Sequence, residues 1–161
     1  MAKRLLSLGL LLLIGLLCGA NAYNGVGIDE TKPAPEIRSI IAEYDVGNDI
    51  EIYDTRLDKV VKSVQAKPEI RNLIIEWINQ TDAIYVKANP FPDEGYIVKV
   101  PLEPPVAVES EWICGSIGEI YIVLSKQDLP FYVVFDESEH ISCYNINGNI
   151  NILLKMLDLN W

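Results

Sequence analysis

One helical stripe, set among long runs of strand-like sequence, limits most strongly what this chain can fold into. Five apolar residues recur at the i, i+3, i+4, i+7 and i+8 positions of a helix: Ile70, Leu73, Ile74, Trp77 and Ile78. This spacing places them on one side of a helix, where they can be buried together. Pro68 stands where a helix tolerates proline best, in its first turn. We therefore predict an amphipathic helix over 67–79 with its apolar side against the core.

A second stripe of the same kind lies at the end of the chain. It consists of Ile150, Leu153, Leu154 and Leu157, and it follows Asn149, whose side chain can cap a first turn. Alternating or continuous apolar residues predict strands over 37–43, 49–54, 59–64, 84–86, 96–100, 106–112, 118–124, 131–135 and 141–146. Because helices and strands do not alternate regularly, we expect an α+β fold: a mostly antiparallel sheet with two amphipathic helices packed on one face.

The first 22 residues differ in composition from the rest of the chain. Lys3 and Arg4 precede an apolar run over 5–17, and small residues at positions 20 and 22 suit a signal peptidase. This order is that of a secretory signal peptide, and the apolar run is shorter than a membrane-spanning helix. We expect cleavage after Ala22, with an uncleaved anchor and lipidation at Cys18 as the alternatives.

The remaining chain has the length of one domain and a strongly negative charge. Residues 23–35, rich in glycine, proline and polar residues, predict a flexible lead-in, and 36–161 predict a single α+β domain. Loss of the leader lowers the number of basic residues from 13 to 11 against 23 acidic ones, a net charge of −12. Nucleic acids and anionic lipids both require Lys and Arg contacts, so neither is an expected partner. We expect a secreted or cell-envelope protein that meets the membrane only through its leader.

Two cysteines remain after the leader, and an even number in an exported protein favours a disulfide between Cys114 and Cys143. The expected strand order opposes this pairing. If the last three strands form a simple meander, Cys143 lies level with Val133, and Cys114 lies about eight residues further along its own strand, over roughly 20 Å away. A disulfide needs Cα atoms within about 7 Å of each other. Both states of the pair therefore stay open at this point.

The densest group of chemically active side chains is Asp136-Glu137-Ser138-Glu139-His140, which holds the only histidine. Carboxylates and imidazole bind cations and transfer protons, so a carboxylate-dependent hydrolase using Glu137, Glu139 and His140 is one alternative. A solvated hairpin turn explains the same residues with ordinary turn chemistry. No G-x-S-x-G elbow, C-x-x-C pair or metal-ligand spacing occurs in the sequence, and we expect no catalytic residue, metal or cofactor.

A stiff loop is the best candidate for an interaction site. Phe91 stands between Pro90 and Pro92, which restrict its backbone, so its ring can be offered to a partner at low entropic cost. A secreted inhibitor that presents this loop is therefore a second alternative. A loop folded over the core is the plain structural explanation.

Four segments of the chain together carry a resemblance to other proteins: IEIYD over 50–54, VVKSV over 60–64, KPEIRNLIIEWI over 67–78 and PFYVVFDE over 130–137. Their layout resembles small secreted or lipoprotein-type domains of unknown function from spore-forming Gram-positive bacteria. The resemblance covers most of the mature chain, and it implies no catalytic residue. With the export signal, it leads us to expect an exported non-catalytic domain that binds an unknown protein or another envelope or extracellular component.

Overall fold

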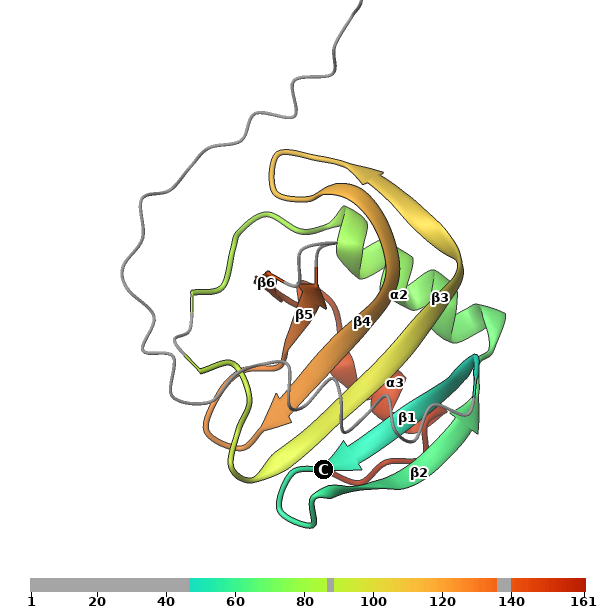
Figure 1. The fold of residues 1–161 in the computed structure, drawn as a ribbon, viewed down its shortest axis with the longest axis vertical. Helices are drawn as coiled ribbons and strands as arrows, with labels where there is room; N and C mark the ends of the chain where they lie inside the picture. Colours follow the sequence, from blue (N-terminus) through green and yellow to red (C-terminus); the bar gives the residue numbers. More distant parts are fainter. Residues whose placement is uncertain (1–46, 87–88, 136–139) are drawn as a thin grey trace, which may run out of the picture.

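The computed structural model describes residues 47–86, 89–135 and 140–161 (Figure 1). The expected signal peptide, lead-in and first strand lie outside these ranges, and so do residues 136–139 of the acidic turn.

A six-stranded sheet in the order β2-β1-β3-β4-β5-β6 forms the centre of the described fold, and each neighbouring pair is antiparallel. Its strands are β1 (Asp49–Asp54), β2 (Lys59–Gln65), β3 (Gly95–Glu109), β4 (Cys114–Ser125), β5 (Phe131–Phe135) and β6 (Ile141–Asn145). The described part of the chain also contains α2 (Pro68–Asn79) and α3 (Ile150–Met156). The predicted α+β class with a mostly antiparallel sheet is therefore confirmed.

Both helices begin where the sequence places a start signal. Pro68 occupies the first turn of α2, whose buried residues are Ile70, Ile74, Trp77 and Ile78. The Asn149 side chain accepts a hydrogen bond from the Asn151 N–H at 3.0 Å and so caps α3. Each fully buried side chain of this size contributes about 1.5–3 kcal/mol, so packing rather than helix propensity stabilises these short elements.

The hairpin of β3 and β4 is much longer than predicted. We expected separate strands over 96–100, 106–112 and 118–124, but β3 runs without a break from Gly95 to Glu109 and β4 already begins at Cys114. The pairing register shifts between Pro101 and Val106, because prolines lack the N–H that the ladder needs. The prolines therefore interrupt the ladder locally without ending the strand, and the hairpin extends as a curved arm beyond the other strands (Figure 1).

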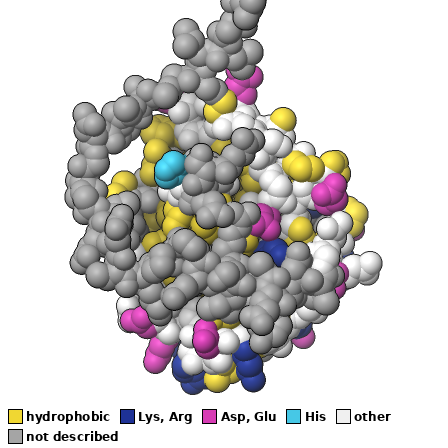
Figure 2. Space-filling view, in the orientation of Figure 1, with side chains coloured by type: hydrophobic (Ala, Val, Ile, Leu, Met, Phe, Trp, Pro, Cys, Tyr) yellow, Lys and Arg dark blue, Asp and Glu magenta, His cyan; other side chains and the backbone are white. Residues whose placement is uncertain are grey.

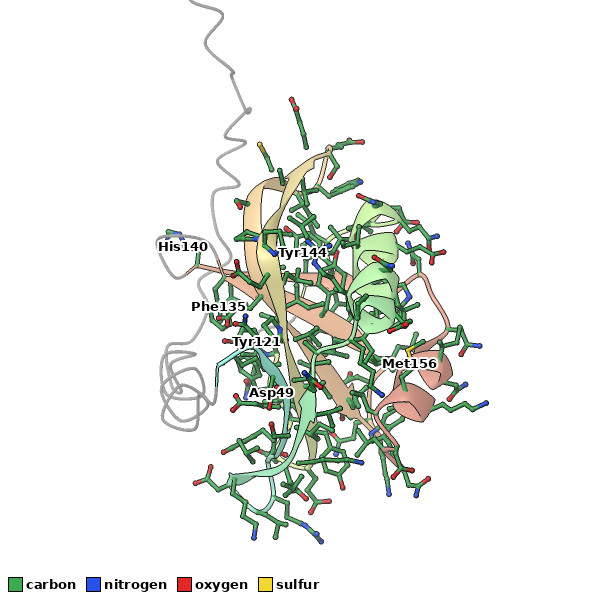
Figure 3. The ribbon with its side chains drawn as sticks, turned by 90° about the vertical axis from the view of Figure 1, so that its right-hand side faces the viewer. Asp49, Tyr121, Phe135, His140, Tyr144 and Met156 are labelled. Carbon is green, nitrogen blue, oxygen red and sulfur yellow. The ribbon has the colours of Figure 1, made fainter. Side chains whose placement is uncertain are left out.

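Side-chain alternation divides the core into two clusters, one for each face of the sheet. The first face carries mainly even-numbered strand residues, such as Ile52 and Ile122, which share a cluster with buried side chains from α2 and α3. The second face carries odd-numbered residues, such as Tyr121 and Val133, which form a separate cluster. In the side view of Figure 3, Tyr121 and Phe135 lie on the side of the strands away from α2. We predicted β1 as a half-buried strand, but both of its faces are buried.

Candidate functional site

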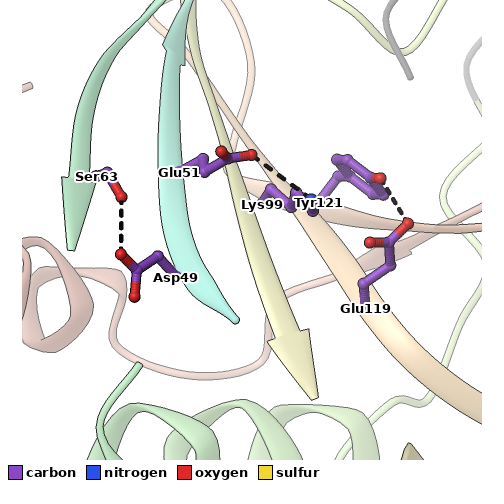
Figure 4. A network of polar contacts seen from close by, with 6 residues as sticks. All are labelled: Asp49, Glu51, Ser63, Lys99, Glu119 and Tyr121. Atoms are coloured by element: carbon purple, nitrogen blue, oxygen red, sulfur yellow. Dashed lines mark hydrogen bonds and ion pairs between the residues drawn. The ribbon is translucent and has the colours of Figure 1, made fainter. Parts of the chain in front are cut away.

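Three polar side chains lie directly opposite one another across the second face. Glu51 in β1 pairs in register with Lys99 in β3, and Lys99 pairs in register with Tyr121 in β4. Residues paired in an antiparallel sheet point to the same face with their Cβ atoms about 5 Å apart. We call Glu51, Lys99 and Tyr121 the polar row, and Figure 4 shows it with its flanking carboxylates, Asp49 and Glu119.

An ion pair joins the first two members of the polar row. Lys99 Nζ lies 3.5 Å from Glu51 Oε2, and the two residues are only 6% and 1% exposed. An isolated charge at such a depth costs several kcal/mol, and the opposite charge offsets much of that cost. The pair therefore makes burial of two charged residues tolerable in the middle of the sheet.

Hydrogen bonds hold the side chains around this pair. Tyr121 Oη donates to Glu119 Oε1 at 2.6 Å, and the Tyr121 ring meets the Phe135 ring edge-on with centroids 5.2 Å apart. At the other end of the network, Ser63 Oγ donates to Asp49 Oδ2 at 3.3 Å. A carboxylate, an ammonium and a phenol side by side can bind charge or transfer protons. The polar row therefore has side chains that suit such chemistry, but Glu51, Lys99 and Tyr121 are all buried from solvent.

A second polar contact lies in the first-face cluster. Tyr132 in β5 is fully buried, its hydroxyl is hydrogen-bonded to Thr81, and its ring lies 5.3 Å from that of Tyr144 in β6. Burial disfavours a charged phenolate, so it raises the pKa of Tyr132 to about 12 and also raises the pKa of Tyr144. These two hydroxyls are therefore structural donors rather than acid–base groups near neutral pH.

The acidic turn, which the sequence offered as an alternative hydrolase site, falls largely outside the described residues. Glu137 and Glu139 are not described, and His140 is exposed directly before β6. Among the residues described, no three of His, Cys, Asp and Glu gather closely enough to hold a metal ion. Of the predicted turn residues only His140 is described, and the hypotheses on Glu137 and Glu139 lie outside the described ranges.

Cys114 and Cys143 lie in different strands of the sheet, at different levels along it. Cys143 is buried as a thiol in β6 and pairs in register with Val133, which itself faces Tyr121. Cys114 begins β4 opposite Glu109. Along β4, Cys114 lies about 20 Å from Tyr121 at roughly 3.3 Å per residue. Cys114 and Cys143 are thus not joined in this structure, and the meander argued from the sequence explains why.

The Phe91 loop is folded inward rather than presented. Phe91 is 8% exposed and packs in the second-face cluster, while its N–H donates to Asn89 Oδ1 at 3.2 Å. Pro90 is buried, and Pro92 is partly buried. Of the two explanations offered by the sequence, the loop folded over the core is the one that the burial of Phe91 fits, because an apolar ring gains more from the cluster than from water.

Sequence reasoning missed the apolar surface around Tyr85. Tyr85 N–H donates to the Cys143 carbonyl at 2.8 Å, Ile84 forms a bridge with Tyr144, and the Tyr85 ring lies 4.7 Å from that of Phe131. Beside this contact Val86 is 90% exposed, Leu129 83% and Ile84 47%. We call residues 84–86 together with 128–131 the Tyr85 edge.

A signal for each missed feature exists in the sequence. The alternation over 84–86 sets Ile84 and Val86 opposite Tyr85, but only the pairing with β6 shows which side faces water. Glu51 and Lys99 carry opposite charges, and both are odd-numbered residues of strands. Once the strand order is known, they can be recognised as a cross-strand pair.

The face of the molecule seen in Figure 2 separates by side-chain type. Apolar side chains gather near the histidine, and charged ones gather at the lower end, where Figure 1 places the turn between β1 and β2.

Neither helix of the described chain is long and apolar enough to span a membrane. No family model, curated protein or solved structure matches this chain.

Proposed function

We propose that this chain is an exported, non-catalytic domain that binds a protein of the cell envelope or extracellular space through the Tyr85 edge. The observation that carries the proposal is the exposure of Val86 (90%) and Leu129 (83%) beside the contact of Tyr85 with Phe131. Large apolar side chains gathered at one place on a surface are typical of interaction sites, whereas single ones are ordinary.

The backbone beneath these side chains is held in place. Tyr85 is tied to β6 by its N–H, and its hydroxyl donates to Asp128 Oδ1 at 3.5 Å, which joins residues 84–86 to the turn that carries Leu129. A surface that is ordered before binding loses less conformational entropy when a partner arrives. The edge therefore supports binding without a folding step.

The charges near the edge indicate what kind of partner fits. Asp82 is exposed and Asp128 is partly buried, while Lys126 is exposed on the same turn as Leu129. With a mature net charge of −12, the surrounding field favours a partner that has an apolar centre and a basic rim. The same field disfavours nucleic acid.

Two further features support binding rather than turnover. The polar row has catalytic side-chain types, but Glu51 and Lys99 form an ion pair in a buried position. We also take α2 and α3 as amphipathic helices packed on the first face, since their buried residues belong to that cluster. A scaffold of this kind leaves the sheet edges and loops for recognition.

Photo-crosslinking in the exporting cell tests the proposal. The full chain carries a photoreactive amino acid at position 129 or, as a matched control, at position 57, because Leu57 is also an exposed large apolar residue (48%). We expect one specific protein adduct from position 129 and none from position 57. Adducts of equal yield from both positions, or none from position 129, would rule out the Tyr85 edge.

Affinity measurements with the captured partner then show how much the apolar side chains of the Tyr85 edge contribute to binding. Val86→Asp and Leu129→Asp should each weaken binding about tenfold or more, because burying such a side chain contributes roughly 1.5–3 kcal/mol and about 1.4 kcal/mol is tenfold. Leu57→Asp should change the Kd by less than about twofold on the same scale.

A further inference from the structure

A pocket of about 240 Å³ lies at the end of the sheet where β1 ends, β3 begins and β4 ends. These three strand ends lie at the lower end of the molecule in Figure 1, beside the mark of the C-terminus. Small-molecule pockets have volumes of roughly 300–1,000 Å³, so an occupant of this one must be small. We call it the Asp54 pocket, and its lining includes Asp54, Arg56, Glu94, Tyr96, Lys126 and Trp161.

A buried carboxylate forms part of this lining. Asp54 is 7% exposed, and its Oδ1 accepts hydrogen bonds from the N–H groups of Arg56 at 3.0 Å and Leu57 at 3.1 Å. The neighbouring wall is also held, because the Thr55 N–H donates to the Gly95 carbonyl at 3.1 Å. Within the described ranges, Asp54 Oδ2 accepts no hydrogen bond. Since buried polar atoms are normally hydrogen-bonded, Oδ2 is an acceptor that a ligand can use.

The charged side chains around this carboxylate balance one another without pairing. Arg56 and Lys126 are exposed, and neither side chain forms an ion pair or a hydrogen bond with any residue that the structure describes, although Glu94 lines the same pocket. Two positive and two negative side chains give a neutral lining, in a chain with a net charge of −10. Such a lining favours a neutral ligand with both donors and acceptors over an anion or a metal cation.

Two aromatic side chains add apolar surface to the pocket. Tyr96 is partly buried, whereas Trp161 is 39% exposed. The chain before Trp161 is held in place, because Lys62 Nζ donates to the Asp158 carbonyl at 2.9 Å and Leu159 packs against the first-face cluster. An aromatic ring at the margin of a pocket offers a flat apolar surface to a ligand.

We propose that the Asp54 pocket binds a neutral saccharide. Each sugar hydroxyl both donates and accepts, so a pyranose ring can donate to Asp54 Oδ2 and accept from Arg56 or Lys126. The C–H face of the same ring packs against the indole of Trp161. A zwitterionic amino acid is neutral as well, but its ammonium has three donors, and Asp54 has only one oxygen left for them.

A titration of the full chain, followed by two-dimensional ¹H–¹⁵N NMR, tests the ligand class. The probes are N-acetylglucosamine and methyl glucoside, and phenylalanine represents a zwitterion. We expect saturable shifts of the Gly95 and Lys126 amides and of the Trp161 indole N–H with at least one sugar. The absence of saturable shifts with both sugars, or tighter binding of phenylalanine than of either sugar, would overturn the proposal.

Single substitutions then test the pocket itself. Asp54→Asn retains an oxygen for the N–H groups of the turn but replaces the second acceptor by a donor, and Trp161→Ala removes an exposed ring. Each should raise the Kd for the sugar about tenfold or more, because each removes an interaction of roughly that size. Asp93→Asn is the matched control, since Asp93 is exposed beside the pocket, and it should change the Kd by less than about twofold.

An unchanged Kd in both Asp54→Asn and Trp161→Ala would mean that the sugar binds elsewhere and would contradict the assignment. The Asp54 pocket shares no residue with the Tyr85 edge. Crosslinking from position 129 and the sugar titration therefore test separate surfaces, and either proposal can fail alone.

Discussion

At the scale of single residues, we expect the stability of the fold to depend strongly on the buried ion pair in the polar row. Glu51 and Lys99 lie in the middle of a sheet face whose other members are mainly apolar, and neither charge reaches water. The exposed pair of Lys62 and Asp158 has nearly the same separation, 3.6 Å against 3.5 Å, but its side chains are 36% and 96% exposed. The two pairs therefore differ in burial rather than in distance.

We predict that Lys99→Met lowers the free energy of unfolding by about 3–5 kcal/mol, because it leaves the Glu51 carboxylate buried without its ammonium partner. The double variant Glu51→Leu with Lys99→Met should recover most of this loss, since no charge then remains to be desolvated. Urea unfolding of the full chain measures both.

The matched control for this prediction is Lys62→Met, which should cost less than about 1 kcal/mol because exposed pairs are screened by water. Equal losses for Lys62→Met and Lys99→Met would show that burial of the pair does not matter.

At the scale of elements, the junction between α2 and α3 is packed without spare room. Gly148 lies just before the Asn149 cap, and a Cβ atom added there would stand 1.9 Å from Trp77 Nε1. Trp77 is itself 1% exposed in the first-face cluster, so its ring cannot move into solvent without loss of packing. The start of α3 therefore depends on the absence of a side chain at position 148.

We predict that Gly148→Ala destabilises the fold by about 1–3 kcal/mol, the usual range for overpacking a filled site. Gly118→Ala in β4 is the control, because an added Cβ there meets nothing within 4 Å, and its effect should stay under about 1 kcal/mol. Tryptophan fluorescence during denaturant unfolding reports both changes. A Gly148→Ala protein as stable as the parent would mean that the Trp77 ring shifts freely.

At the scale of the whole molecule, the buried tyrosines make stability depend on alkaline pH. Burial raises the pKa of Tyr132 to about 12 from an ordinary value of 10, and the pKa of Tyr144 moves in the same direction. The folded state keeps these protons above pH 10, where the unfolded chain loses them. The free energy of unfolding therefore falls as pH rises, because the native state then binds more protons than the unfolded state.

We predict that tyrosine ionisation leaves the free energy of unfolding unchanged below about pH 10. As the pH rises from about 10 to about 12, Tyr132 alone should lower the free energy of unfolding by roughly 1.4 kcal/mol per pH unit. Urea unfolding at a series of pH values measures the slope, and Tyr132→Phe should reduce it. A slope that is the same in the parent and in Tyr132→Phe would contradict the role of this hydroxyl.

Local spacing in the sequence was sufficient for the elements that depend on near neighbours. The stripe from Ile70 to Ile78 and the cap at Asn149 act within one or two turns, so both helices could be predicted from residues close in the chain. The alternation of β1 was likewise readable, and so was the meander that keeps Cys143 away from Cys114.

Only the tertiary structure decided which surfaces meet. Periodicity shows that Glu51 and Ile52 point in opposite directions, but it does not show that both directions are buried or that Lys99 lies opposite Glu51. The inward turn of Phe91 and the contact of Tyr85 with Phe131 likewise join segments that are far apart in the sequence. Side-chain direction is a local property of the backbone, whereas burial and pairing depend on what the rest of the chain brings to each face.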